Sequence, residues 1–337
     1  MGCNFTPTCS IKAIWDSARA MKQNLLLTIV ILSALPLAAL RAEEGAGGHY
    51  VPGATATFID TLPGKPGIVV ANAFTYYDGS ASVGRPILFG GQATADAHAT
   101  VYADSLFGIY QTPLQLLAGN YAVAATIPFI WLDVDATVTP PIGPSFRQSD
   151  SASGLGDITL YPFMLGWTNA MDLKYDVRLG VYAPSGDYTV GKLANTGRNY
   201  WTFEPAASVS WLSTKIGIEV TVFAGLDFNT KNTATDYESG TSFHLEGTLA
   251  QHLPLGKLGI IGLGANAFLY QQISADSGSG ATLGDFEGRT AGVGPAISFV
   301  TKIGKADIAA EVKWLPELNV EKRLKGDTVW FKLGVVF

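Results

Sequence analysis

The chain has 337 residues, a formal net charge of −6 and 38 glycines; 47% of its residues are hydrophobic and only 15% are charged, against about 25% charged residues in an ordinary globular protein. This composition is too apolar for a disordered chain and too rich in glycine for a helical bundle. No uninterrupted apolar run reaches the roughly 20 residues that a membrane helix needs, so a helical transporter is excluded and a soluble domain or a β-barrel in lipid remains.

Residues 1–42 have the pattern of a secretory signal. An almost wholly apolar stretch from Leu25 to Leu35 is followed by Pro36 and by a region of small residues that ends at Ala42. We predict cleavage after Ala42, with a single membrane anchor as the alternative. Residues 1–20 precede a second methionine, Met21, and we interpret them as an over-extended start.

Cleavage there changes both the cysteine content and the charge of the chain. It removes Cys3 and Cys9, so the mature chain forms no disulfide. It also leaves 18 basic and 27 acidic residues, a net charge of −9. Because such a surface repels a phosphate backbone, we expect no nucleic-acid partner.

Residues 43–66 are rich in glycine, proline and threonine and are too short for a domain. We hypothesise that they fold back into the interior of a barrel as a small plug, in which His49, Tyr50 and the prolines form a stiff, hairpin-like insert. A flexible periplasmic tail is the alternative. The barrel domain itself is predicted over residues 67–337.

From about residue 67 onward, apolar residues fall on every second position, which is the period of a strand with one apolar face. In residues 216–228, for example, Val220 and Val222 share one face while Glu219 and Thr221 share the other. The pattern predicts twelve strands, at residues 67–77, 99–110, 121–134, 155–167, 172–182, 200–212, 215–228, 241–253, 257–270, 288–301, 305–315 and 327–337.

The connections between these predicted strands alternate in length, and the first and the last are both long. An even strand number, short periplasmic turns and long external loops are typical of bacterial outer-membrane barrels. Such a barrel closes, because an open edge in hydrocarbon leaves backbone N–H and C=O groups unpaired. We therefore predict an all-β transmembrane antiparallel up-and-down β-barrel of about 12 strands, surrounded by outer-membrane lipid, with both termini periplasmic.

Aromatic residues are spaced as the two borders of a lipid bilayer require. Trp201 and Trp211 share a strand face ten residues apart, which spans roughly 25 Å along the axis of a tilted strand and matches the apolar band between aromatic girdles. The core of a soluble sandwich is the alternative. The predicted girdle consists of Tyr121, Trp131, Trp167, Trp201, Trp211 and Trp314.

The opposite face of the same strands carries a set of charges of both signs that would line the interior, or lumen. Its members are Lys174, Asp176, Arg178, Glu204, Glu219, Asp227, His244 and Glu246. One hypothesis is a polar constriction that orients a solute. The other is a network of paired charges that fills and stiffens the interior, because buried charges need partners.

Two further features belong to the ends of the predicted barrel. Residues 183–199 contain turn-forming residues suited to an external loop, which either gates the outer mouth or is ordered without any selective role. Phe337, the last residue, resembles the signal by which the outer-membrane barrel assembly machinery recognises its clients, so that machinery is an expected partner. A plain girdle residue is the alternative.

Six groups of residues carry a resemblance to a known family. They are His49-Tyr50-Val51-Pro52-Gly53 with Leu62-Pro63-Gly64-Lys65-Pro66-Gly67, Gly154-Leu155-Gly156-Asp157-Ile158, Ala183-Pro184-Ser185-Gly186-Asp187-Tyr188 with Gly197-Arg198-Asn199, Asp236-Tyr237-Glu238-Ser239-Gly240, Leu283-Gly284-Asp285-Phe286-Glu287-Gly288-Arg289, and Gly292-Val293-Gly294-Pro295. In this order they resemble a Gram-negative family of outer-membrane β-barrels named for the meta-pathway of phenol degradation and described as transporters or channels. The resemblance implies movement of aromatic or other hydrophobic molecules across the outer membrane, without a firmly shared substrate.

Two rival functions remain open. A barrel lipid hydrolase would use Ser242 and His244, but these residues point to the lumen, and residues two apart on one face of a strand are about 7 Å apart, beyond hydrogen-bond reach. We therefore expect no enzyme. A structural or adhesive outer-membrane barrel with a filled lumen is the main alternative to a channel.

The histidines that follow the signal, His49, His98, His244 and His252, are scattered and have no cysteine beside them. This spacing shows no metal motif, and we expect neither metal nor cofactor. The sequence as a whole predicts a passive outer-membrane channel for small hydrophobic or aromatic compounds.

Overall fold

The computed structural model describes residues 47–81, 86–169, 172–282 and 287–337. The expected signal, residues 1–42, lies outside the described residues, and so do residues 283–286 of the fifth group that carries the resemblance. Among the described residues, no helix is long and apolar enough to cross a membrane.

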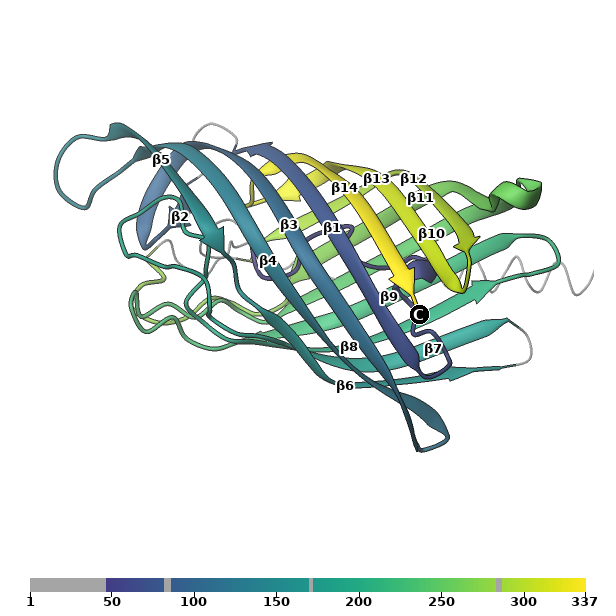
Figure 1. The fold of residues 1–337 in the computed structure, drawn as a ribbon. Helices are drawn as coiled ribbons and strands as arrows, with labels where there is room; N and C mark the ends of the chain where they lie inside the picture. Colours follow the sequence, from purple (N-terminus) through teal and green to yellow (C-terminus); the bar gives the residue numbers. More distant parts are fainter. Residues whose placement is uncertain (1–46, 82–85, 170–171, 283–286) are drawn as a thin grey trace, which may run out of the picture. The chain divides into compact units, whose positions relative to one another are not determined.

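Strands make up most of the described chain (Figure 1). Their bounds are β1 Gly67–Ser80, β2 Ile87–Phe89, β3 Gln92–Leu116, β4 Gly119–Val138, β5 Phe146–Leu155, β6 Thr159–Thr168, β7 Leu173–Tyr182, β8 Thr202–Leu212, β9 Ile218–Asn229, β10 Ser242–Pro254, β11 Ile260–Gln272, β12 Arg289–Ile303, β13 Ala306–Glu321 and β14 Lys325–Val336. Two short 3₁₀ turns, η2 Phe58–Asp60 and η3 Gly256–Leu258, accompany them.

The strands form a closed antiparallel barrel. β1 pairs with β14 from Val69–Val336 to Ser80–Lys325, which joins the two ends of the sheet. β5 and β6 pair with successive parts of β4 and together occupy one position, while β2 only extends the edge of β3. Within the described residues the barrel therefore has twelve strand positions, and the predicted fold class is confirmed.

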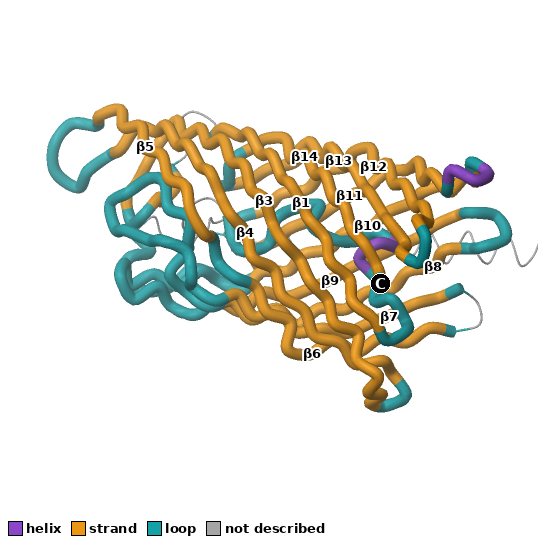
Figure 2. Tube along the Cα trace, viewed as in Figure 1, coloured by secondary structure: helices purple, strands orange, loops and turns teal. Residues whose placement is uncertain are grey.

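The start of β1 and the end of β14 lie at the edge of the barrel where the turns are short. Phe337 donates its backbone N–H to the carbonyl of Ile68 at 2.9 Å, beside the start of β1. The longer loops gather at the opposite edge (Figure 2). We call these edges the short-turn end and the long-loop end; that the short-turn end faces the periplasm stays a prediction.

Several strands are longer than the alternation predicts. β3 and β4 extend on both sides of the predicted strands 99–110 and 121–134, and only three residues separate β13 from β14, where a long connection was expected. The expected strand 155–167 corresponds to β6, which begins only at Thr159, and β5, which ends at Leu155, is not among the predicted strands. Alternation fails at these places because the strand extensions lie outside the apolar band. Outside that band, the outer face of a strand need not be apolar.

Alternation within the band is obeyed. On β9, Val220 and Val222 are about 40% exposed on the outer face, whereas Glu219 and Thr221 are buried inside. The outer surface thus carries contiguous exposed apolar side chains around the barrel, as a lipid-facing surface requires.

Candidate functional site

The inward faces of β7 to β14 form a surface that we call the polar wall. It carries the eight predicted lumen residues. Lys174 is half-buried, and the other seven are buried: Asp176, Arg178, Glu204, Glu219, Asp227, His244 and Glu246. The structure therefore places all eight on the inner side of the barrel.

Most of these charges have a partner close by. Arg178 donates to both oxygens of Asp176, each at 2.8 Å, in a bidentate pair that satisfies both buried charges. His252, which sequence reasoning did not select, lies 2.7 Å from Glu219. Glu204, Asp227 and His244 form a third group. The eight residues are thus distributed over separate pairs and clusters rather than around one ring.

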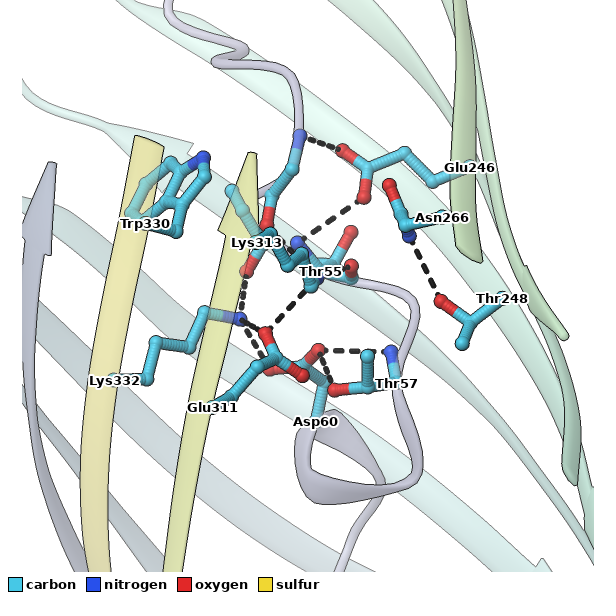
Figure 3. A network of polar contacts seen from close by, with 12 residues as sticks. Thr55, Thr57, Asp60, Glu246, Thr248, Asn266, Glu311, Lys313, Trp330 and Lys332 are labelled. Carbon is cyan, nitrogen blue, oxygen red and sulfur yellow. Dashed lines mark hydrogen bonds and ion pairs between the residues drawn. The ribbon is translucent and has the colours of Figure 1, made fainter. Parts of the chain in front are cut away.

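Residues 47–66, which we call the insert, run through the interior and are held by the polar wall (Figure 3). Glu246 is the central acceptor: it receives the Tyr50 hydroxyl at 2.7 Å and the backbone N–H groups of Gly53 and Thr55 at 2.8 and 3.3 Å. Phe58 donates its backbone N–H to Glu219 at 2.7 Å. Carboxylates of the wall therefore satisfy backbone donors that no strand pairing reaches.

Two lysines satisfy the backbone acceptors of the insert. Lys313 donates to the carbonyls of Gly53 and Thr55 at 3.0 and 2.7 Å. Lys332 donates to the carbonyl of Ala54 at 2.7 Å and to the carboxylate of Asp60 at 2.9 Å (Figure 3). These bonds involve charged groups in a buried place, where each such bond contributes about 1.5–3 kcal/mol.

Burial alone would raise the pKa of Asp60, but the nearby Lys332 and Lys313 more than offset it, so the pKa of Asp60 lies below its usual value. Asp60 is therefore the anionic partner of Lys332. At the other end of the insert, His49 contacts Thr202 at 2.7 Å and Asp157 at 2.9 Å. Burial lowers the pKa of His49 below its ordinary value.

Sequence reasoning did not nominate Glu311, Lys313 or Lys332 as lumen residues. Glu311 and Lys313 lie on the polar face of the predicted strand 305–315, so alternation contained the signal for their direction. Their importance comes from the insert, whose path no local pattern reveals.

The inward faces of β1, β3 and β4 form a second surface, the apolar wall. Its side chains are small or apolar: Val69, Ala71, Ala73, Val101, Ala103, Phe107, Pro128, Ile130 and Leu132. A cavity of about 780 Å³ lies among this wall, the insert and residues of the polar wall. The interior is thus asymmetric, since the bonds that anchor the insert come from the polar wall and the open space adjoins the apolar one.

The loop between β7 and β8, residues 183–201, covers the apolar wall at the long-loop end. Leu193 and Ala194 are buried in one cluster with Ile87 of β2 and Ala136 of β4. Asp150 of β5 accepts the backbone N–H groups of these two loop residues at 3.1 and 3.4 Å. This loop therefore packs into the mouth of the barrel.

The predicted girdle residues lie on the outer face at two levels. Trp131, Trp201 and Trp314 are 42–50% exposed, and a row of paired residues, Val329, Tyr76 and Tyr102, connects Trp314 to Trp131 across the strands. Tyr121, Trp167 and Trp211 are less exposed and lie nearer the short-turn end. Phe337 is 70% exposed at that end.

The serine and histidine of the hydrolase hypothesis are not brought together. Ser242 donates its hydroxyl to Asp227 at 3.0 Å, and His244 makes no hydrogen bond to it. Both side chains are buried inside the barrel. This geometry does not activate a serine toward lipid.

A closed antiparallel barrel of twelve positions, with an apolar outer surface, aromatic residues at two levels and an N-terminal insert, defines the class of outer-membrane β-barrels. Comparison with family models then identifies the family. Residues 83–333 match the family described as "Putative MetA-pathway of phenol degradation", and the chain belongs to it.

Solved structures share the architecture. An outer membrane channel from Pseudomonas putida F1 superposes with a TM-score of 0.60 at 15% sequence identity, covering 86% of this chain and 100% of the other. The β domain of the Bordetella autotransporter BrkA gives a TM-score of 0.43 at 12% identity, covering 81% and 99% of the two chains. A search of curated proteins gives no match. The first likeness supports the fold.

Proposed function

We propose that the protein is a passive channel of the outer membrane that admits small hydrophobic or aromatic compounds. The observation that carries this proposal is the 780 Å³ cavity beside the apolar wall. Apolar linings with a few polar groups are typical of sites for such ligands. Membership of the phenol-degradation family and the likeness to a channel of Pseudomonas putida F1 agree with it.

The remaining expectations extend the same proposal. Residues 1–42 direct export and are removed, residues 43–66 act as the plug, and residues 67–337 form the barrel. The polar wall anchors the plug, the six aromatic residues of the girdle position the barrel in lipid, and Phe337 serves the assembly machinery. The channel works without an enzymatic step and without energy input.

Liposome swelling tests the proposal with two zwitterions that cross lipid slowly, phenylalanine and asparagine. We expect faster swelling in phenylalanine. The variant Ala103→Trp fills the cavity from the inner face of β3 and should slow phenylalanine entry several-fold. The matched control Leu106→Trp adds the same ring on the outer face of β3, where Leu106 is exposed, and should leave the rate unchanged.

The contrary results are equally clear. Swelling in neither solute, in a preparation whose barrels are folded, would favour the structural or adhesive alternative with a filled lumen. Equal rates for both solutes would retain a channel but reject its preference for aromatic compounds.

A further inference from the structure

Three ionisable side chains converge on the inner face of β8, β9 and β10. The pairs Phe203–Phe228 and Ala206–Gly225 place Glu204 opposite Asp227 across two adjacent strands. His244 of β10 lies beside both: its Nε2 atom is 3.0 Å from Glu204 Oε1 and 3.6 Å from Asp227 Oδ1. All three side chains are at most 5% exposed.

Two of the three converging atoms make no hydrogen bond within the described residues. Neither ring nitrogen of His244 makes one within the described chain, and neither does Asp227 Oδ1. The other oxygen of each carboxylate is fixed from behind, because Tyr182 donates to Glu204 Oε2 at 2.9 Å and Ser242 donates to Asp227 Oδ2 at 3.0 Å. Such outer contacts orient ligand atoms in metal sites.

Room at the cluster depends on a glycine. A Cβ atom on Gly225 would lie 2.5 Å from His244 Nε2 and 3.2 Å from Glu204 Oε1, so any larger residue would intrude on the converging atoms. On the other side, the ring of Tyr50 stacks on His244 at 4.1 Å between centroids. The cluster thus lies between Gly225 and the Tyr50 ring of the insert, and Glu204 and His244 also line the 780 Å³ cavity.

The spacing and the charge both suit a cation. Tetrahedral coordination with bonds of about 2.0–2.1 Å separates ligand atoms by roughly 3.3 Å, and the observed 3.0 and 3.6 Å lie on either side of this value. Two facing carboxylates repel each other when buried, and a divalent ion removes that repulsion. One imidazole with two carboxylates favours first-row transition metals over calcium or magnesium.

We propose that Glu204, Asp227 and His244 bind a divalent first-row transition-metal ion, of which Zn²⁺ is the representative. The three ligands come from three strands, which is why no local sequence motif announces them. Cross-strand register brings them together. The site is separate from the anchors of the insert at Glu246, Lys313 and Lys332 and does not rest on the proposed channel function.

Titration of tag-free, folded protein in detergent with Zn²⁺ after chelator treatment tests the site. We expect one Zn²⁺ per chain by calorimetry and elemental analysis, and visible absorption bands of low-symmetry coordination when Co²⁺ replaces it. Glu204→Gln and Asp227→Asn should each weaken binding by more than about 100-fold, because even changes to outer contacts cost 10- to 100-fold.

Two further variants separate ligation from a general effect on the barrel. Gly225→Ala keeps all three ligands but fills their space and should also abolish binding. His252→Gln breaks the neighbouring histidine–carboxylate pair with Glu219 and should bind Zn²⁺ as the unaltered protein does. Absence of stoichiometric binding in the unaltered protein, or unchanged affinity in Glu204→Gln and Asp227→Asn, would overturn the proposal.

Discussion

Single buried charges determine where the insert lies. Lys313 is fully buried, lies 3.1 Å from Glu311 and also donates to two backbone carbonyls of the insert. Because removing one partner of a buried pair leaves the other charge uncompensated, such a change typically costs about 3–5 kcal/mol. Lys313 therefore links the charge of Glu311 on the polar wall to the backbone of the insert.

Lys313→Met should loosen the insert. Among the described residues, loss of the ammonium leaves Glu311 with Lys332 at 3.5 Å and frees the carbonyls of Gly53 and Thr55. We expect faster hydrogen exchange in residues 50–60 and a higher single-channel conductance. Lys302→Met is the control, since its pair with Asp307 is exposed and exposed pairs contribute at most about 1 kcal/mol. Equal effects of both variants would contradict this role.

His49 gives the insert a dependence on pH. Burial lowers the pKa of His49, and Arg198 acts in the same direction, against the opposing effect of Asp157. In a detached insert His49 recovers its ordinary pKa of 6.5. Acid therefore favours detachment: the stability of the docked state is complete above pH 6.5 and declines as the pH falls below it.

Conductance measured as a function of pH tests this dependence. We expect the conductance to rise below about pH 6.5 and the rise to be absent in His49→Gln, which keeps a polar side chain next to Asp157 and Thr202 but does not titrate. Tyr182 and Tyr200, whose rings contact His49, remain in place in that variant. The same pH dependence in both proteins would assign it to another group.

For single residues, the sequence predicted which face of a strand each side chain occupies, but not which side chains contact one another. Alternation placed Glu204, Asp227 and His244 on the inner face, yet their convergence depends on the register of three strands, and a one-residue slip would send each to the outside. The contacts of Glu246 could not be predicted for a different reason: they come from an insert that has no regular period.

Among the elements, strands were predicted where both water and lipid constrain them. β9 alternates without interruption, because one face meets hydrocarbon and the other meets charges. The last part of β4 and the paired part of β5 carry polar outward residues, including Asp133 and Ser151, so the pattern disappears although the ladder continues. The break after β5 is tertiary in origin, since Asp157 turns to accept backbone N–H groups of Gly186 and Arg198.

A single buried charge should displace the loop between β7 and β8 from the mouth of the barrel. Leu193→Glu places a carboxylate in an apolar cluster where Leu193 is 2% exposed, which costs several kcal/mol without a partner. We expect a higher conductance and readier proteolytic cleavage within the loop. Val190→Glu, at an exposed position of the same loop, is the control and should change neither measurement.

At the scale of the whole molecule, the polar wall and the apolar wall have different roles in the interior. Much of the polar wall is occupied by its own ion pairs and by bonds to the insert, whereas the apolar wall faces the cavity. A barrel of this size has an interior between those of filled eight-stranded barrels and the water channels of large porins. The space that the insert leaves open therefore determines whether water or an apolar solute can pass through the barrel.

Deletion of residues 47–66 tests this division directly. The change exposes Glu246, Lys313 and Lys332 to a widened interior, where water can solvate charges that the insert now satisfies. The barrel should still assemble, because its strand ladder closes without the insert between β1 and β14. Ion conductance should increase strongly, and the preference for phenylalanine over asparagine should fall, because a hydrated polar wall admits both solutes. An unchanged conductance with a folded barrel would mean that the loop at the long-loop end, rather than the insert, limits passage.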